Sequence, residues 1–340
     1  MVTGIDVENF SDADFALLRT ALFTHQVLVI KNQSHASPAA QFALTHRFDP
    51  AAPACYGHGK TVDSKRSILH PDLKTIPHQP QVQVIGNGFV PSYEGLENIR
   101  LRHPHHRTFH ATAVPDADDL THTRFYRWHI DAALYGAALA PPVVTTLLAV
   151  RVPKGRRQTC VYEDHGSDAG DTLDVPLGTT AFASGEAMYD LLSEEDKAFA
   201  RTTRVEYAPH PYVWMSAARS RADGLGLVSE GREVPLAQLP PFERGEVQIL
   251  PMCWRNEVTG RLALQVHPSA VRRLHLGDGS VVEDLEEVRG LRTGCRGRVL
   301  DLRGSTRMTG RKGIWWFFIT GRAALGGGSV PEDEVRLFRQ

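Results

Sequence analysis

The chain has 340 residues, of which 42% are hydrophobic and 23% are charged, a composition typical of a globular protein with one large domain or two ordinary ones. Its 38 basic and 39 acidic residues give a formal net charge of −1. This balance excludes the strongly basic surface expected of a nucleic-acid-binding protein or of one that binds an anionic membrane. A small-molecule partner is therefore expected, while composition leaves the oligomeric state unknown.

The cysteines and the N-terminus indicate a cytoplasmic protein. The four cysteines are too few and too scattered for a disulfide framework, and no CxxC pair indicates structural zinc. The first fifteen residues, MVTGIDVENFSDADF, contain no basic start and no apolar signal segment. No run of about 18 apolar residues occurs anywhere, so no membrane partner is expected.

The N-terminal part of the chain alternates helix and strand signals. Residues 11–24, SDADFALLRTALFT, begin with a capping serine and repeat apolar residues at helical spacing. The apolar run at 26–32 predicts a buried strand, and 37–47 predict a second short helix. Residues 81–90, QVQVIGNGFV, alternate as a strand does before a glycine turn.

The remaining elements are mostly short strands and turns. A His-rich loop at 103–110 precedes two predicted strands, 124–131 and 143–152, which are separated by a turn at Pro141 and Pro142. Residues 184–202 have a helical pattern that restarts at Ser193, and 245–251, 260–267 and 281–290 predict strands and turns. Because no repeat or linker occurs, residues 1–340 are expected to form a single domain. The pattern predicts a mainly β, α+β fold, a barrel or sandwich with flanking helices.

Two His-x-Asp patterns are candidates for metal binding. Non-haem iron enzymes hold Fe(II) on one face with two histidines and a carboxylate, and alternation along a strand places residues i and i+2 on the same side. His129 and Asp131 end an aromatic strand candidate, whereas His70 and Asp72 lie in a polar, proline-interrupted stretch that reads as a loop. From the local sequence alone, His129 and Asp131 are either metal ligands or a pair of side chains that contact only each other.

The surrounding residues resemble a known family. The stretch RFYRWHIDAALYGAALAPPVVTTLLAVRVPKG at 124–155 resembles the iron-binding region of the taurine dioxygenase superfamily of Fe(II)- and 2-oxoglutarate-dependent oxygenases. Further runs, HPHHRTFH, VPLGTTAF, RVEYAPHPYVWMS and LALQVHP, are similar to its xanthine dioxygenase branch. The resemblance covers residues from about 5 to about 293 and the last dozen. It implies a double-stranded β-helix, or jelly-roll, core.

The resemblance also assigns roles to individual residues. It implies that His129 and Asp131 are catalytic Fe(II) ligands, and that Fe(II), 2-oxoglutarate and O2 together hydroxylate xanthine to uric acid with release of succinate and CO2. Thr159 matches the threonine that hydrogen-bonds 2-oxoglutarate, and Arg339, with Arg336 as its rival, matches the arginine that holds the distal carboxylate. The residues able to bind the edges of a flat, polar purine are Gln340, Gln81, Gln83, Asn87 and Arg102.

The second iron histidine of the family is absent from its expected place. Residues 295–328 contain no G-D-x-x-x-F-x-N-R pattern and carry an aromatic WWFF cluster instead. Another frame of the codons permitted for 295–321 spells G-D-L-V-V-F-H-N-R, and a further shift over 324–328 restores the histidine. We therefore interpret 295–328 as a suspected out-of-frame segment, a gene-model artefact that leaves the C-terminal part of the jelly roll disrupted. His267 and His275 are the alternative third ligands within the chain as written, and a buried strand is the alternative for WWFF.

Other functions are left open by the sequence. His103, His105, His106 and His110 could form a zinc site, although a structural or substrate-pocket role suits them as well. The same oxygenase chemistry could act on a sulfonate or another small substrate. A chain that lacks the second histidine could also be an inactive remnant.

Overall fold

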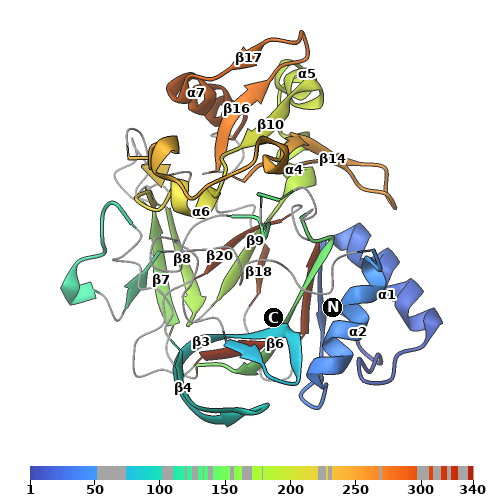
Figure 1. Ribbon diagram of the computed structural model, residues 1–340. Helices are drawn as coiled ribbons and strands as arrows, with labels where there is room; N and C mark the ends of the chain where they lie inside the picture. Colours follow the sequence, from blue (N-terminus) through green and yellow to red (C-terminus); the bar gives the residue numbers. More distant parts are fainter. Residues whose placement is uncertain are drawn as a thin grey trace.

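The computed structural model describes residues 1–51, 74–101, 110–118, 121–124, 129–132, 134–136, 141–153, 157–162, 171–177, 179–220, 227–228, 232–267 and 270–296, and the backbone of four later strands. The side chains of residues 162, 171, 227, 228 and of those beyond 291 lie outside this description. Figure 1 shows a sheet-rich molecule with helices at its edges.

The largest sheet has seven strands and is built from both ends of the chain. Its order is β1-β19-β6-β21-β3-β2, with β4 also paired to β3. Every pairing in it is antiparallel. The strands are β1 (Val27–Ile30), β2 (Lys74–Ile76), β3 (Gln79–Tyr93), β4 (Leu96–Leu101), β6 (Val144–Arg151), β19 (Trp315–Ile319) and β21 (Arg336–Arg339).

Two three-stranded sheets lie across the centre of the molecule (Figure 1). The first is β5 (His122–Thr123), β7 (Arg157–Tyr162) and β8 (Asp171–Pro176), in which β5 runs parallel to β7. The second places β9 (Thr180–Ser184) between β18 (Thr306–Met308) and β20 (Ala323–Gly327). The described part of the chain is thus mainly sheet, as the sequence predicts.

The N-terminal helices cover the large sheet. α1 (Asp12–His25) begins with a capping box in which the Ser11 hydroxyl accepts from Asp14 N–H and Asp14 reaches back to Ser11. This exchange lowers the pKa of Asp14 through the Ser11 hydrogen bonds. α2 (Pro38–Phe48) begins at Pro38 after the Ser37 cap. Leu18, Leu22 and Leu44 pack from these helices onto β1 and β6. Of the apolar residues that repeat at helical spacing in 11–24, Leu18 and Leu22 are buried, whereas Leu17 is 65% exposed.

Residues 185–296 form an insertion between β9 and β18, at the top of Figure 1, and share a hydrophobic core with Ile130, Ala132 and Leu134. Its sheets are β13-β10-β16-β17 and the hairpins β11-β12 and β14-β15. These strands are β10 (Arg204–Tyr207), β11 (Arg219–Ser220), β12 (Leu227–Val228), β13 (Ile249–Pro251), β14 (Cys253–Arg255), β15 (Leu262–Leu264), β16 (Val271–His275) and β17 (Val281–Val282). The helices are α4 (Gly185–Asp190), α5 (Glu194–Thr202), α6 (Pro211–Trp214) and α7 (Leu285–Arg296).

Short 3-10 turns complete the connections, at η2 (Asp116–Asp118), η3 (Leu236–Gln238) and η4 (Arg244–Glu246).

A buried polar cluster joins the insertion to the N-terminal helix. The fully buried Asn256 donates to Phe23 O over 2.6 Å and to Glu186 Oε1 over 2.7 Å, and Arg261 pairs with the same carboxylate at 3.1 Å. Because a buried amide without partners is costly, this cluster fixes how α1 meets the insertion.

Most predicted elements are confirmed, with two corrections. The strand predicted at 124–131 is not found in its described part, since Arg124 and residues 129–131 belong to no strand, and residues 125–128 lie outside the described residues. The helix restart at Ser193 is confirmed, since its hydroxyl accepts from Asp196 N–H at the start of α5. The expectation of strand and turn throughout 281–290 was wrong beyond β17. Residues from Leu285 form α7 because Asp284 caps its first turn through Glu287 N–H at 2.9 Å and Val288 is buried beneath it.

The WWFF cluster forms β19, a strand between β1 and β6, as the alternative interpretation predicted for its backbone. Within the described ranges, no helix is long and apolar enough to span a membrane.

Candidate active site

The side chains of His129 and Asp131 come together, as predicted, although residues 129–131 belong to no strand. The distance from His129 Nε2 to Asp131 Oδ1 is 3.4 Å, and their side chains are 29% and 21% exposed. Between them Ile130 is only 4% exposed and belongs to the core of the insertion. The side chains of His129 and Asp131 are therefore partly open to solvent, while the buried Ile130 anchors the backbone between them. The aromatic residues 125–128 that precede the pair lie outside the described residues.

The geometry of this pair suits a metal ion. Two ligand atoms that each lie about 2.1 Å from an ion, at right angles, are about 3 Å apart, close to the observed separation. A neutral imidazole and a carboxylate are two of the three donors of an iron(II) facial triad. Among the residues that the structure describes, no group of three or more His, Cys, Asp or Glu is placed to hold a metal. The described part of the chain thus brings together two side chains of the types found in such a centre.

The backbone that follows Asp131 is held by the insertion. The Tyr212 hydroxyl, on α6, donates to Ala132 O. Gln248 Nε2 donates to Gly136 O over 2.9 Å, and Gly136 N–H donates to Glu246 O over 2.8 Å. Hence backbone groups just beyond Asp131 are paired with side chains and backbone that lie at least 80 positions later in the sequence.

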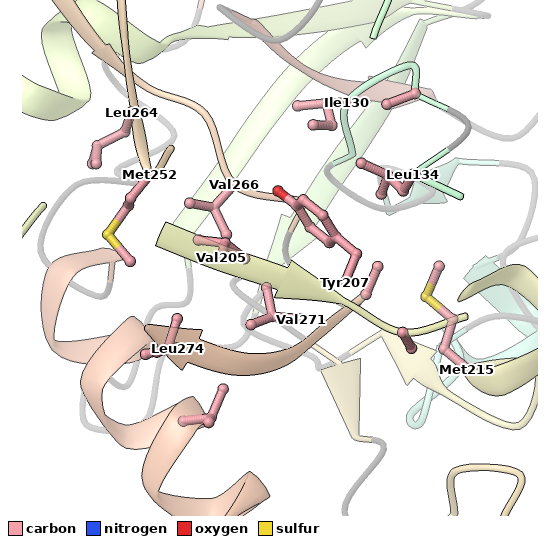
Figure 2. Packing of buried hydrophobic residues seen from close by; sticks show 14 of the residues in the cluster. Ile130, Leu134, Val205, Tyr207, Met215, Met252, Leu264, Val266, Val271 and Leu274 are labelled. Atoms are coloured by element: carbon pink, nitrogen blue, oxygen red, sulfur yellow. The ribbon is translucent and has the colours of Figure 1, made fainter. Parts of the chain in front are cut away.

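This segment also contains a left-handed residue inside the core. Leu134 has φ of 55° and is fully buried, a conformation that costs an L-residue about 1 kcal/mol or more. Figure 2 shows Leu134 and Ile130 close to the Tyr207 ring within the core of the insertion. Packing and hydrogen bonds together therefore impose the conformation of the segment that follows His129 and Asp131.

Tyr135 continues this packing toward the surface. Its ring lies 4.4 Å from that of His210, and its hydroxyl accepts from Glu243 N–H at 3.2 Å. Burial raises the pKa of the Tyr135 phenol, with the carboxylates of Glu246 and Glu243 adding to the effect. The phenol is therefore neutral at neutral pH and keeps a proton to donate.

Thr159, the residue matching the 2-oxoglutarate threonine, is half-buried on β7. Its neighbours Gln158 and Cys160 are buried on the opposite face of the strand. His122 and Asp174 flank it in register on β5 and β8. The structure places Thr159 in a different sheet from the one that contains β3 and β21.

The predicted substrate and carboxylate residues meet in the large sheet. Gln81, Gln83 and Asn87 alternate along β3, where Asn87 is buried and Gln81 Oε1 accepts from Gln79. The backbone of Arg336 pairs with Asn87 and that of Arg339 pairs with Val84. The strand with both arginine candidates therefore lies next to the strand with three of the purine-binding candidates. Arg102, Gln340 and the arginine side chains lie outside the described residues.

The alternative histidine ligands have other surroundings. His267 is 2% exposed, and its ring packs edge-on against that of Tyr212 at a centroid distance of 6.1 Å. Its backbone N–H donates to the Tyr207 hydroxyl. His275 Nε2 forms an ion pair with Glu206 Oε2 at 2.9 Å in the insertion. These contacts are those of a core histidine and of a structural ion pair.

The zinc alternative and the second HxD pattern fall mostly on undescribed residues. His110 is buried and its backbone bridges Ser220, whereas His103, His105, His106, His70 and Asp72 lie outside the described ranges. Sequence reasoning did not single out Tyr212 or Gln248. A tyrosine in the apolar run RVEYAPHPYVWMS is indistinguishable from an ordinary core residue until its hydroxyl partner is known.

A sheet-rich fold and a His-x-Asp pair whose side chains lie 3.4 Å apart are features expected of a metal-dependent oxygenase of the facial-triad class. Residues 2–292 match the sequence profile of the taurine catabolism dioxygenase family (TauD, TfdA family). The chain belongs to this family, and the resemblance noted in its motifs is confirmed.

Curated relatives agree with this assignment. An alpha-ketoglutarate-dependent xanthine dioxygenase of Neurospora crassa is 68% identical, across the whole chain and 81% of the relative. One of Emericella nidulans is 59% identical, across the whole chain and 90% of the relative. One of Schizosaccharomyces pombe is 49% identical over 85% of this chain and 70% of the relative.

Solved structures support the fold. A taurine dioxygenase from Burkholderia xenovorans superposes with a TM-score of 0.54 at 16% identity, over 99% of this chain and 82% of the other. The structure of AAD-2 in complex with Mn(II) and N-oxalylglycine superposes with a TM-score of 0.55 at 14% identity, over 99% and 91%. At these identities the likeness concerns the fold alone.

Proposed function

We propose that this chain is an Fe(II)- and 2-oxoglutarate-dependent dioxygenase that hydroxylates xanthine to uric acid. The observation that supports the substrate most strongly is the 59–68% identity, across the whole chain, to relatives named for this reaction. The convergence of His129 and Asp131 at 3.4 Å supports the metal. The large sheet and the two central sheets, we propose further, form a jelly-roll core within one domain.

The protein residues have distinct roles in this proposal. His129, as neutral imidazole, and Asp131, as carboxylate, hold the metal. The Thr159 hydroxyl donates to the carboxylate of 2-oxoglutarate, and the planar guanidinium of Arg339, or of Arg336, holds the distal carboxylate through two parallel hydrogen bonds. When bound, Fe(II) with 2-oxoglutarate and O2 would supply the oxidising chemistry that inserts one oxygen atom of O2 into the C8–H bond of xanthine, while the other enters succinate as CO2 is released.

The purine requires groups that donate and accept in the plane of its ring. Amide side chains do both, so Gln81, Gln83, Asn87 and Gln340 are proposed to contact the edges of xanthine, and Arg102 to stabilise the anionic product. The burial of Asn87 beside β21 supports a position close to the proposed 2-oxoglutarate arginine. Because xanthine offers little apolar area, its recognition depends on these paired hydrogen bonds.

We further propose that residues 295–328 are translated out of frame and that the gene encodes the second iron histidine. The family profile supports this proposal because its match ends at residue 292. The genomic DNA across residues 290–330 provides the test. Codons that spell the family pattern in a shifted frame are expected, whereas codons incompatible with that frame would leave His267 or His275 as the available histidines.

The test of the function is succinate formation by the chain that the verified nucleotide sequence encodes. Succinate is expected only when xanthine, Fe(II), 2-oxoglutarate and O2 are all present, with one uric acid formed per succinate. Taurine and other sulfonates serve as the alternative substrates. Turnover of a sulfonate in place of xanthine would overturn the substrate, and failure to bind Fe(II) would indicate an inactive remnant.

A further inference from the structure

Tyr212 lies in the insertion, at the point where the insertion meets the segment that follows His129 and Asp131. The residue is 8% exposed and belongs to the apolar core. It lies on α6, and its hydroxyl donates to the carbonyl of Ala132, the residue immediately after Asp131. A buried phenol needs a hydrogen-bond partner, and this one is provided by the backbone next to the carboxylate rather than by a nearby core residue.

The segment that Tyr212 contacts does not hold its conformation by local preference. Leu134 adopts φ of 55° with its side chain fully buried, and a non-glycine residue in this region persists only where surrounding contacts impose it. A further side-chain contact, from Gln248 to Gly136 O at 2.9 Å, lies at the far end of the segment. Tyr212 therefore fixes the end of the segment that adjoins Asp131.

We infer that the Tyr212 hydroxyl is a positioning residue for the Asp131 carboxylate, acting through the Ala132 carbonyl to hold the metal ligand at its distance from His129. The inference rests on the proposed function for its metal, and it assigns to the insertion a direct part in forming the site. His267 supports Tyr212 from the side, since their rings meet edge-on at 6.1 Å. His267, one of the alternative third metal ligands, would then pack against Tyr212 and not bind the metal.

The chain offers a closely matched control. Tyr189 is also 8% exposed and belongs to the same core. Its hydroxyl accepts from Arg201 Nη1 at 3.0 Å, on α5. Tyr212→Phe and Tyr189→Phe each remove one hydroxyl and one hydrogen bond from the same cluster. The two variants differ in whether that bond reaches the backbone beside Asp131.

The experiment combines hydrogen–deuterium exchange with metal binding in the full chain. In Tyr212→Phe, exchange of the backbone amides in 132–136 is expected to rise about threefold to tenfold, with Mn(II) bound about tenfold more weakly. Tyr189→Phe is expected to leave both unchanged relative to the unmodified chain. Because both variants lose one buried hydroxyl, a general loss of stability would affect them equally.

The outcomes separate this inference from the proposed function. Equal exchange in 132–136 for the two variants would overturn the positioning role. If the unmodified chain binds Mn(II), equal Mn(II) affinities of the two variants would overturn it as well. If the unmodified chain binds no Mn(II), the metal centre of the proposed function fails, and exchange alone then decides whether Tyr212 holds the segment.

Discussion

Two histidine–carboxylate pairs in different regions of the molecule differ in what surrounds the carboxylate. The side chains of His129 and Asp131 are 3.4 Å apart, outside any strand, with that of Asp131 21% exposed. His275 and Glu206 are 2.9 Å apart in the sheet of the insertion, with the Glu206 side chain 7% exposed. Arg272 and Arg273 each approach Glu206 to 3.3 Å as well.

The comparison shows why a histidine beside a carboxylate does not by itself make a metal site. The charge of Glu206 is already balanced by two guanidinium groups, and a divalent cation placed there would be repelled by both. Burial, together with the neighbouring Arg273, lowers the pKa of Arg272, which shows how closely these charges are packed. The two members of that pair come from β10 and β16, whereas His129 and Asp131 lie two positions apart on one face.

The largest expected effect is the loss of turnover in Asp131→Asn. An amide keeps the shape of the carboxylate but removes its charge, so succinate formation with xanthine should fall by more than about a hundredfold. The control is Asp12→Asn, an exposed carboxylate that pairs with Arg47 between the two N-terminal helices. Comparable turnover in Asp131→Asn and Asp12→Asn would contradict a metal-binding role for Asp131.

The next effect concerns the arginines of β21. If Arg339 holds the distal carboxylate of 2-oxoglutarate, Arg339→Gln should raise the KM for 2-oxoglutarate about tenfold to a hundredfold, with the KM for xanthine much less affected. Arg336→Gln is the control, because it lies on the same strand. A larger effect in Arg336→Gln would exchange the roles of the two arginines.

Glu206→Gln should destabilise the fold and leave the metal site intact. Removing the charge leaves Arg272, Arg273 and His275 close together without their shared counter-ion, and the free energy of unfolding should fall by about 2 kcal/mol. Denaturant titration measures this change. A drop in Mn(II) affinity with unchanged stability would show that the metal binds at Glu206 and His275, and not at His129 and Asp131.

The smallest effect is expected for His275→Asn. The His275 side chain is 30% exposed, and partly exposed ion pairs contribute little, so stability should change by about 0.5 kcal/mol. The KM for 2-oxoglutarate should stay the same. A large rise in that KM would instead support His275 as the alternative third ligand.

The sequence predicted the features that depend on residues close together in the chain. The helix caps at Ser11 and Ser193, the strand at 143–152 and the shared face of His129 and Asp131 all follow from spacing and residue type. The anchoring of the segment after Asp131 could not be predicted, because Tyr212 and Gln248 reach it only once the insertion has folded. α7 was missed because its glycines obscured a helix that the Asp284 cap and the burial of Val288 stabilise.

The most direct test of the account is anaerobic binding of Fe(II) to the chain that the verified nucleotide sequence encodes and to its Asp131→Asn and Glu206→Gln variants. One Fe(II) per chain is expected for the unmodified chain and for Glu206→Gln, with affinity at least about a hundredfold weaker in Asp131→Asn. Equal affinity in Asp131→Asn and the unmodified chain would contradict the assignment of His129 and Asp131 as the metal-ligand pair.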